Sequence, residues 1–151
     1  MSENDNAERM STHAETQSRK EREMKENDIT KEIVDAAYKV HVTLGPGLLE
    51  SVYESVLEYE LKKRGFRVSR QVILPVHYES IRIEEGYRAD LIVEEKVIVE
   101  LKSVEEIAPV HKKQLLTYLR LADKRLGLLI NFGDALIKRG ITRVVNGLPE
   151  D

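Results

Sequence analysis

Apolar residues recur at helical spacing in two stretches of the first half of the chain. Between residues 29 and 44 they recur every three or four positions, which predicts an amphipathic helix with Asp28 as its N-cap. Gly, Pro and Gly at residues 45–47 would end this helix. A second helix is expected at about residues 48–64, with Gly65 directly after it. Its expected packing positions are Leu49, Val52, Tyr53, Val56, Tyr59 and Leu61.

After Gly65 the pattern changes to that of β-strands. Residues 66–80 alternate partly and contain Pro75, which suits an edge strand or a bulge. Residues 87–103 form two runs rich in Leu, Ile and Val, and a three-residue turn at 94–96 would join them as a hairpin.

The second half of the chain predicts one more helix and two more strands. Residues 110–123 return to helical spacing, residues 126–132 form the apolar run typical of a strand buried on both faces, and residues 141–147 suit a last strand. We find no internal repeat in the 151 residues. The pattern therefore predicts a single α/β domain in which a helix crosses between strands.

Residues 1–28 differ in composition from the rest. They contain no Leu, Ile, Val, Phe, Tyr or Trp, and they carry eight acidic and five basic side chains. We expect a disordered or loosely helical leader, followed by a folded domain at residues 29–148. The leader accounts for the formal net charge of −3, since the remainder carries equal numbers of acidic and basic side chains. Contact with nucleic acid would therefore need a local basic surface.

Two further features of the composition narrow the class of protein. The chain has no cysteine, which excludes disulfides, thiolate metal sites and a cysteine nucleophile. It also has no apolar run near the roughly 20 residues that cross a bilayer, and its N-terminus lacks the apolar stretch of a signal peptide. We therefore expect a cytoplasmic protein with no membrane partner.

Three charged residues interrupt the predicted hairpin: Asp90, Glu100 and Lys102. With a turn at residues 94–96, Asp90 lies opposite Glu100 and all three side chains share one face. Opposed carboxylates repel, and Mg²⁺ or Mn²⁺ would resolve this, with the Leu101 carbonyl as a further ligand. Lys102 would then orient or activate the nucleophile and offset phosphoryl charge. The alternative is that these charges protect an edge hairpin from aggregation and that Lys102 simply neutralises Glu100 and Asp90.

The motif GLLESVY at residues 47–53 resembles the G-x-x-E-x-x-Y signature of the GxxExxY proteins, a group within the PD-(D/E)XK nuclease-like superfamily. The resemblance extends over about residues 29–146. It implies a restriction-endonuclease-like domain, with a central mixed sheet flanked by helices and a core in the order helix, three strands, helix, strand.

The resemblance also implies roles for individual residues. Asp90 matches the aspartate of the second superfamily motif, and Glu100 with Lys102 matches the E-x-K of the third. Glu50 matches the helical glutamate of the first motif, although an acidic residue at a helix start is also favoured by the helix dipole alone. Ala89 stands where the superfamily has a nominal proline. The implied ligands of Mg²⁺ or Mn²⁺ are Asp90, Glu100 and Glu50, the last through a water or a second metal.

Gln114 and Tyr118 look like the Q-x-x-x-Y of the branch related to RecB-type nucleases. Their four-residue spacing puts both on one helical face, where they would form the rim of the same site. The alternative is a surface glutamine beside a core tyrosine. The implied catalytic residues are thus Lys102, Glu50, Gln114 and Tyr118.

Two classes of function remain open. One is a metal-dependent nuclease that acts on DNA or RNA, and the other is a catalytically silent module that keeps the fold and binds nucleic acid or protein. The presence of all four expected polar groups favours the enzyme. The short chain and neutral body favour a homodimer or a protein partner that supplies substrate selection.

Overall fold

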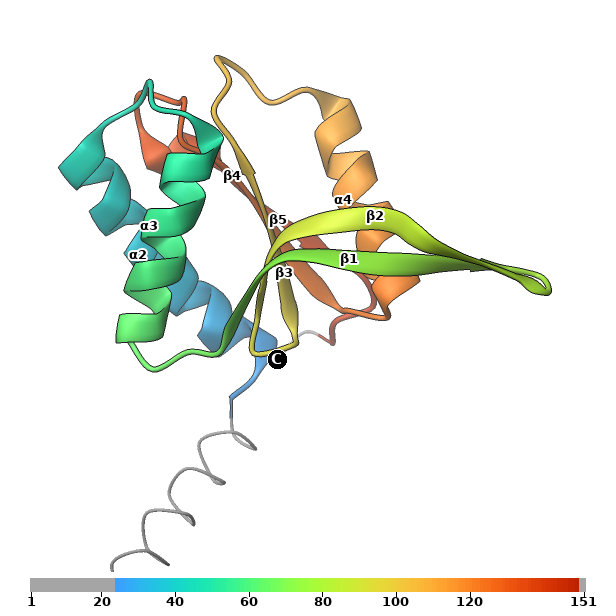
Figure 1. Ribbon diagram of the computed structural model, residues 1–151. Helices are drawn as coiled ribbons and strands as arrows, with labels where there is room; N and C mark the ends of the chain where they lie inside the picture. The colour runs from blue at the N-terminus through green and yellow to red at the C-terminus, as the bar shows by residue number, and fades with distance from the viewer. Residues whose placement is uncertain (1–23, 150–151) are drawn as a thin grey trace, which may run out of the picture.

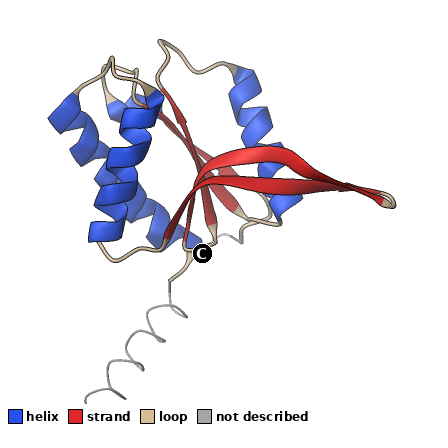
Figure 2. Ribbon diagram, in the orientation of Figure 1, coloured by secondary structure: helices blue, strands red, loops and turns tan. Residues whose placement is uncertain are grey.

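The computed structural model describes residues 24–149, so most of the predicted leader lies outside the described residues. A five-stranded sheet forms the centre of the domain, with helices packed against both of its faces (Figures 1 and 2). The elements follow one another as α2 (Glu26–Leu44), α3 (Glu50–Lys63), β1 (Val68–Tyr78), β2 (Ile81–Val93), β3 (Val97–Lys102), α4 (Pro109–Ala122), β4 (Leu126–Asn131), the short 3₁₀ helix η1 (Ile137–Gly140) and β5 (Ile141–Val145).

The strands are ordered β1-β2-β3-β4-β5 across the sheet. The β3–β4 pair is parallel and the other pairs are antiparallel, and α4 makes the crossover that a parallel pair requires. This arrangement confirms the predicted α/β fold with a mixed sheet between helices. It also places β3 at the centre of the sheet with β2 beside it. The idea that the charges on β2 and β3 protect an exposed edge is therefore wrong.

The core has two layers, one on each side of the sheet. The larger layer joins the sheet to α2 and α3, and the smaller layer joins it to Leu115 and Leu119 of α4. The apolar residues on one face of the hairpin all lie in the larger layer: Leu91, Val93, Val97, Val99 and Leu101. Their partners Ile92 and Ile98 lie in the smaller layer, as strand alternation requires.

Helix α2 begins two residues before the predicted N-cap. Lys25 occupies the N-cap position, and its backbone N–H donates to the Asp28 carboxylate at 3.4 Å. Met24 packs against the core, and its carbonyl accepts a hydrogen bond from Lys96 Nζ at 2.6 Å. Residues 26–28, which we assigned to the leader, therefore belong to the first helix.

The buried face of α3 differs from the predicted one. Leu49 and Tyr59 are 73% and 67% exposed. The buried residues of the helix are Tyr53, Glu54, Leu57, Glu60 and Leu61. Of the predicted packing positions, Tyr53 and Leu61 are buried and Val56 packs against the core. The pattern missed Glu54 and Glu60 because they are charged.

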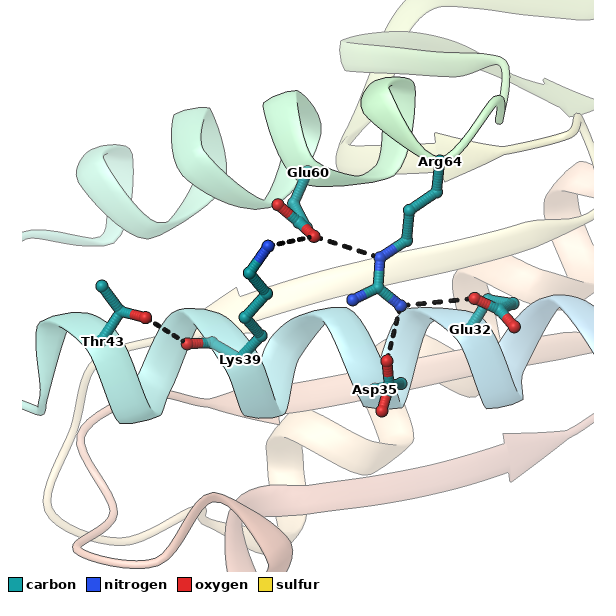
Figure 3. A network of polar contacts seen from close by, with 6 residues as sticks. All are labelled: Glu32, Asp35, Lys39, Thr43, Glu60 and Arg64. Atoms are coloured by element: carbon teal, nitrogen blue, oxygen red, sulfur yellow. Dashed lines mark hydrogen bonds and ion pairs between the residues drawn. The ribbon is translucent and has the colours of Figure 1, made fainter.

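One of these glutamates, Glu60, belongs to a network that joins α2 to α3 (Figure 3). Its carboxylate accepts hydrogen bonds from Lys39 at 3.0 Å and from Arg64 at 3.2 Å. Arg64 also contacts Asp35 at 2.7 Å and Glu32 at 3.3 Å. The hydrogen bond from Lys39, together with Arg64, lowers the pKa of Glu60. Glu60 is therefore a structural carboxylate that basic partners keep ionised.

Strands β1 and β2 continue beyond the body as a projecting two-stranded arm (Figure 1). Their register shifts between Leu74 and Val76, at Pro75, and β1 is an edge strand. Both expectations for Pro75 are met, because a residue without an N–H is tolerated at an edge and at a bulge.

Candidate active site

Asp90 and Glu100 meet where the β2–β3 ladder ends. The ladder pairs Leu91 with Val99 and continues to the turn in the predicted register. Beyond that pair, side chains replace the ladder bonds. Asp90 Oδ2 accepts the Leu101 N–H at 2.8 Å, and Glu100 Oε1 accepts the Asp90 N–H at 3.3 Å. Each carboxylate is therefore held by the backbone of the opposite strand.

The strands lose their regular alternation at the same point. Ala89 packs in the layer under α4, but Leu91, two residues later, packs in the layer under α2 and α3. A regular strand would put both on one face, so β2 reverses its faces at Asp90. On β1, Gln71 has a positive φ of 51° and is followed by Val72, which packs in the layer under α4. At this irregularity the Asp90 side chain turns toward Leu101 and accepts its N–H.

Burial and charge repulsion act together on Glu100. Burial of the carboxyl group, followed by the neighbouring Asp90, raises the pKa of Glu100 to about 8, and nearby Lys102 opposes this shift. Burial and the charge of Asp90 thus favour the protonated form of Glu100. Two close oxygen donors that cannot both ionise are a donor set that suits a hard divalent cation.

Lys102 is the last residue of β3 and is half-buried. It pairs in register with Asn131 of β4, and its carbonyl accepts the Phe132 N–H at 2.8 Å. The buried Asn131 side chain bonds both the N–H and the carbonyl of Val104, at 3.0 and 2.9 Å. These bonds fix the chain just after Lys102. The sequence analysis missed Asn131, which stood in an apolar run without a visible partner.

Glu50 lies at the start of α3, close to the end of β3. Its Oε1 accepts the Ser103 N–H at 3.4 Å, and Ser103 Oγ donates to the Leu48 carbonyl at 2.8 Å. Glu50 thus lies beside the residue that follows Lys102. Residues 24–149 contain no group of three or more His, Cys, Asp or Glu side chains arranged to hold a metal ion. A direct role for Glu50 as a third ligand stays a prediction.

The tyrosine of the GLLESVY motif explains how this helix start is held. Tyr53 is fully buried and stacks on Phe132 with ring centroids 4.5 Å apart. Its hydroxyl donates to the Gly45 carbonyl at 2.6 Å and accepts the Leu48 N–H at 3.0 Å. Gly47, between them, has a φ of 102° that favours glycine. The motif therefore anchors the turn that presents Glu50.

Gln114 and Tyr118 lie on one face of α4, as predicted. Gln114 Nε2 donates to the Tyr118 hydroxyl at 2.8 Å. Burial raises the pKa of Tyr118, and the charges of Glu100 and Asp90 raise it further. Tyr87 stacks on Tyr118 at 4.4 Å. The Tyr118 side chain is half-buried, whereas that of Gln114 is exposed to solvent.

The sequence analysis missed three polar residues whose hydrogen bonds lead to Asp90: Arg70, Glu54 and Gln71. Glu54 of α3 is only 5% exposed, and its Oε1 accepts a hydrogen bond from Arg70 Nε at 2.7 Å. Gln71 Nε2 donates to both Glu54 oxygens, at 2.8 and 2.9 Å, and reaches Asp90 Oδ1 at 3.4 Å. One signal was present: Glu54 stands between Tyr53 and Leu57 on the buried stripe of α3.

Comparisons with known proteins identify the family. No curated protein and no solved structure matches the chain significantly. No helix in the described part of the chain has the length and apolar character needed to span a membrane. The sequence model of the PD-(D/E)XK nuclease superfamily matches residues 27–144, which include every site residue described above. The chain therefore belongs to the PD-(D/E)XK nuclease superfamily.

Proposed function

We propose that this protein is a metal-dependent phosphodiesterase that cuts DNA or RNA. Membership of the superfamily supports a nuclease-like function. The observation that carries the proposal is the pair Asp90 and Glu100, cross-bonded at the end of the β2–β3 ladder, with Lys102 two residues further along β3. Two carboxylates alone would only bind a cation, whereas an added ammonium group on the same strand face also serves hydrolysis.

The oxygen donors suit Mg²⁺ or Mn²⁺. Asp90 and Glu100 would hold the ion, with the Leu101 carbonyl as a further ligand and Glu50 assisting through a water. The raised pKa of Glu100 supports this assignment, because a nearby cation would offset the repulsion from Asp90. The chemistry expected from a bound ion is Lewis-acid polarisation of the phosphoryl group.

The remaining residues act on the water and the phosphate. The Lys102 ammonium would orient the attacking water and stabilise negative charge that develops on the phosphoryl oxygens. Tyr118 and Gln114, which are bonded to each other on α4, would form the rim of the site and donate hydrogen bonds to a phosphate.

We place the chain among the GxxExxY proteins within the superfamily, on the motif GLLESVY and the anchoring contacts of its tyrosine. We expect a cytoplasmic protein with nucleic acid as its substrate. Because acidic and basic side chains balance beyond the leader, affinity for nucleic acid should be weak and sensitive to salt. A second copy of the chain or a protein partner would then contribute to substrate selection.

The test compares cation binding with cleavage in matched variants. Assays at low salt with Mg²⁺ and Mn²⁺ in turn should use single-stranded, duplex and branched substrates. Lys102→Ala should keep Mn²⁺ binding, measured by calorimetry, but lower the cleavage rate by about 100-fold or more. Asp90→Asn, which keeps an oxygen for the Leu101 N–H, should lose both. Lys138→Ala, an exposed lysine on η1, serves as the control and should cleave like the wild type.

Two outcomes would contradict the proposal. If the purified wild type cuts none of these substrates, or if Lys102→Ala cuts equally well, the nuclease assignment fails and the fold assignment alone is kept. Binding of nucleic acid without cleavage under any metal condition would favour the catalytically silent module instead.

A further inference from the structure

Gln71 connects two carboxylates that lie on different elements. Its Nε2 donates to both oxygens of Glu54 on α3 and reaches Oδ1 of Asp90 on β2. A carboxylate accepts hydrogen bonds and cannot donate them, so the amide nitrogen must face both groups and the amide oxygen must point away. The orientation of the Gln71 amide is therefore fixed by its two acidic neighbours.

We propose that Gln71 is a positioning residue that fixes the Asp90 carboxylate for the divalent cation, and that Glu54 holds Gln71 in place. The role in cation binding rests on the function proposed above. The positioning of Asp90 itself is a statement about the metal-free protein and can be tested without a cation.

Asp90 is held from two directions. Its Oδ2 accepts the Leu101 N–H at 2.8 Å, and its Oδ1 accepts from Gln71 at 3.4 Å. With one oxygen bonded to β3 and the other to β1, rotation of the carboxylate is restricted. Loss of a partner that orients a metal ligand in this way commonly lowers metal affinity by roughly 10- to 100-fold.

The backbone of Gln71 supports the same conclusion. Its φ of 51° lies in the left-handed region, which is uncommon for residues other than glycine, aspartate and asparagine. Such a conformation persists where surrounding contacts hold it. For Gln71 those contacts are the hydrogen bonds to Glu54 and Asp90, both of which lie at the proposed site or directly behind it.

Glu54 is suited to be the fixed end of this chain of contacts. It is 5% exposed, and a buried carboxylate is stable only with partners. Arg70 Nε, at 2.7 Å, supplies the positive charge, so Glu54 remains available as an acceptor for Gln71. The sequence of contacts therefore runs from Arg70 through Glu54 and Gln71 to Asp90.

A second arginine–carboxylate pair shows what a structural contact on β1 requires. Just before β1, Arg67 Nε contacts the Glu94 carboxylate at 2.8 Å, and the Glu94 side chain is 9% exposed, close to the 7% of Glu54. This pair joins the segment just before β1 to the β2–β3 turn. Arg67 and Glu94 are separated along the chain from Gln71 and Asp90. It provides a matched control for effects of stability alone.

The decisive variant is Gln71→Gly. Glycine adopts a positive φ without strain, so this change removes the side chain while favouring the backbone conformation. We expect the melting temperature to stay close to that of the wild type, while the Mn²⁺ dissociation constant rises by about 10-fold or more. Arg67→Ala should lower the melting temperature and leave the Mn²⁺ dissociation constant unchanged.

A metal-free readout separates this inference from the proposed function. The Leu101 amide proton reports directly on Asp90, because Asp90 Oδ2 is its acceptor. In Gln71→Gly the Leu101 amide signal should shift and exchange faster with solvent relative to Val99 in the same strand. In Arg67→Ala the ratio of the two exchange rates should not change.

The outcomes are distinct. If Gln71→Gly leaves the Leu101 amide unchanged, the inference is overturned, whatever the protein does with Mn²⁺. If the Leu101 amide changes but Mn²⁺ affinity does not, the positioning of Asp90 has no role in cation binding and the inference is again overturned. If the wild type binds no Mn²⁺ and cuts nothing, the proposed function fails, and the Leu101 amide alone decides whether Gln71 positions Asp90.

Discussion

Two glutamates in this domain are both largely shielded from solvent, but their pKa values are shifted in opposite directions. Glu60 lies between α2 and α3, and Glu100 lies at the end of the β2–β3 ladder, both largely shielded from solvent. The hydrogen bond from Lys39 lowers the pKa of Glu60, whereas burial and Asp90 raise the pKa of Glu100 to about 8. The difference comes from the partners: Glu60 faces two basic groups, and Glu100 faces another carboxylate.

The comparison separates a carboxylate whose charge is neutralised by basic partners from one that lies beside another carboxylate. The Glu60 network is complete in itself, because two cations already surround the acid (Figure 3). At Glu100, close negative charge is offset only in part by Lys102. Perturbed carboxylates of the second kind concentrate at functional sites. The contrast between the two glutamates can be tested by substitution at each of them and at the neighbouring Tyr118.

The largest expected effect is a loss of stability with rising pH that belongs to Glu100. Its pKa is raised from 4.5 in the unfolded chain to about 8 in the folded protein, so the folded state binds the extra proton between these values. Stability of the metal-free protein should therefore fall from pH 4.5 to pH 8, by at most about 5 kcal/mol. Glu100→Gln should remove this loss, as measured by urea unfolding in EDTA across that range.

Glu105→Gln, an exposed glutamate in the loop after β3, is the control and should keep the wild-type slope. The groups that face Glu100 are Asp90, Lys102 and Tyr118, and all three are retained in both variants. Identical slopes for the wild type and Glu100→Gln would show that Glu100 ionises normally, and the contrast with Glu60 would disappear.

Glu60 should give a pH effect of the opposite sign. Its pKa is lowered in the folded state, so its stabilising effect is present above the unfolded pKa of 4.5 and is lost as the pH falls through the lower folded value. Glu60→Gln should therefore lower the melting temperature at neutral pH and flatten the loss of stability in acid. Equal acid sensitivity in the variant and the wild type would show that Glu60 does not contribute to the loss of stability in acid.

The smallest effect is expected at Tyr118, whose pKa is raised in part by the charge of Glu100. Tyr118→Phe removes the hydroxyl that accepts from Gln114 but keeps the ring that stacks on Tyr87. The free energy of unfolding should fall by about 1 kcal/mol or less, and cleavage by less than in Lys102→Ala. Tyr87→Phe, which removes a hydroxyl bonded to the Tyr118 carbonyl at 3.2 Å, is the matched control. Equal losses of cleavage in the two variants would exclude a specific role for the Tyr118 hydroxyl.

The sequence predicted the hairpin well because its register has few alternatives. The turn and the runs of Leu, Ile and Val fix which residues face each other, since a slip of one residue would expose the whole apolar set. The register from Leu91–Val99 to Val93–Val97 followed directly. The reversal of faces at Asp90 was not predicted; it coincides with the positive φ of Gln71, whose side chain contacts Glu54 of α3.

The sequence predicted buried polar residues poorly. A periodic pattern treats charge as a mark of the solvent face, so the buried Glu54 and Glu60 were not among the expected packing positions, whereas the exposed Leu49 and Tyr59 were. Burial of these glutamates depends on arginine and lysine partners from elsewhere in the chain. Strand order likewise depends on the tertiary fold, so the sequence alone did not exclude that the hairpin lies at an edge of the sheet.

The cross-strand bonds of Asp90 and Glu100 would have a consequence for uptake of the proposed cation. The same carboxylates that would ligate the ion also fasten β2 to β3 beyond the last ladder pair. Loading the site and closing this end of the hairpin therefore involve shared atoms, and changes in one alter the other. Truncating either acid to alanine frees the backbone N–H that it caps, so such variants report on sheet fraying as well as on ligand loss.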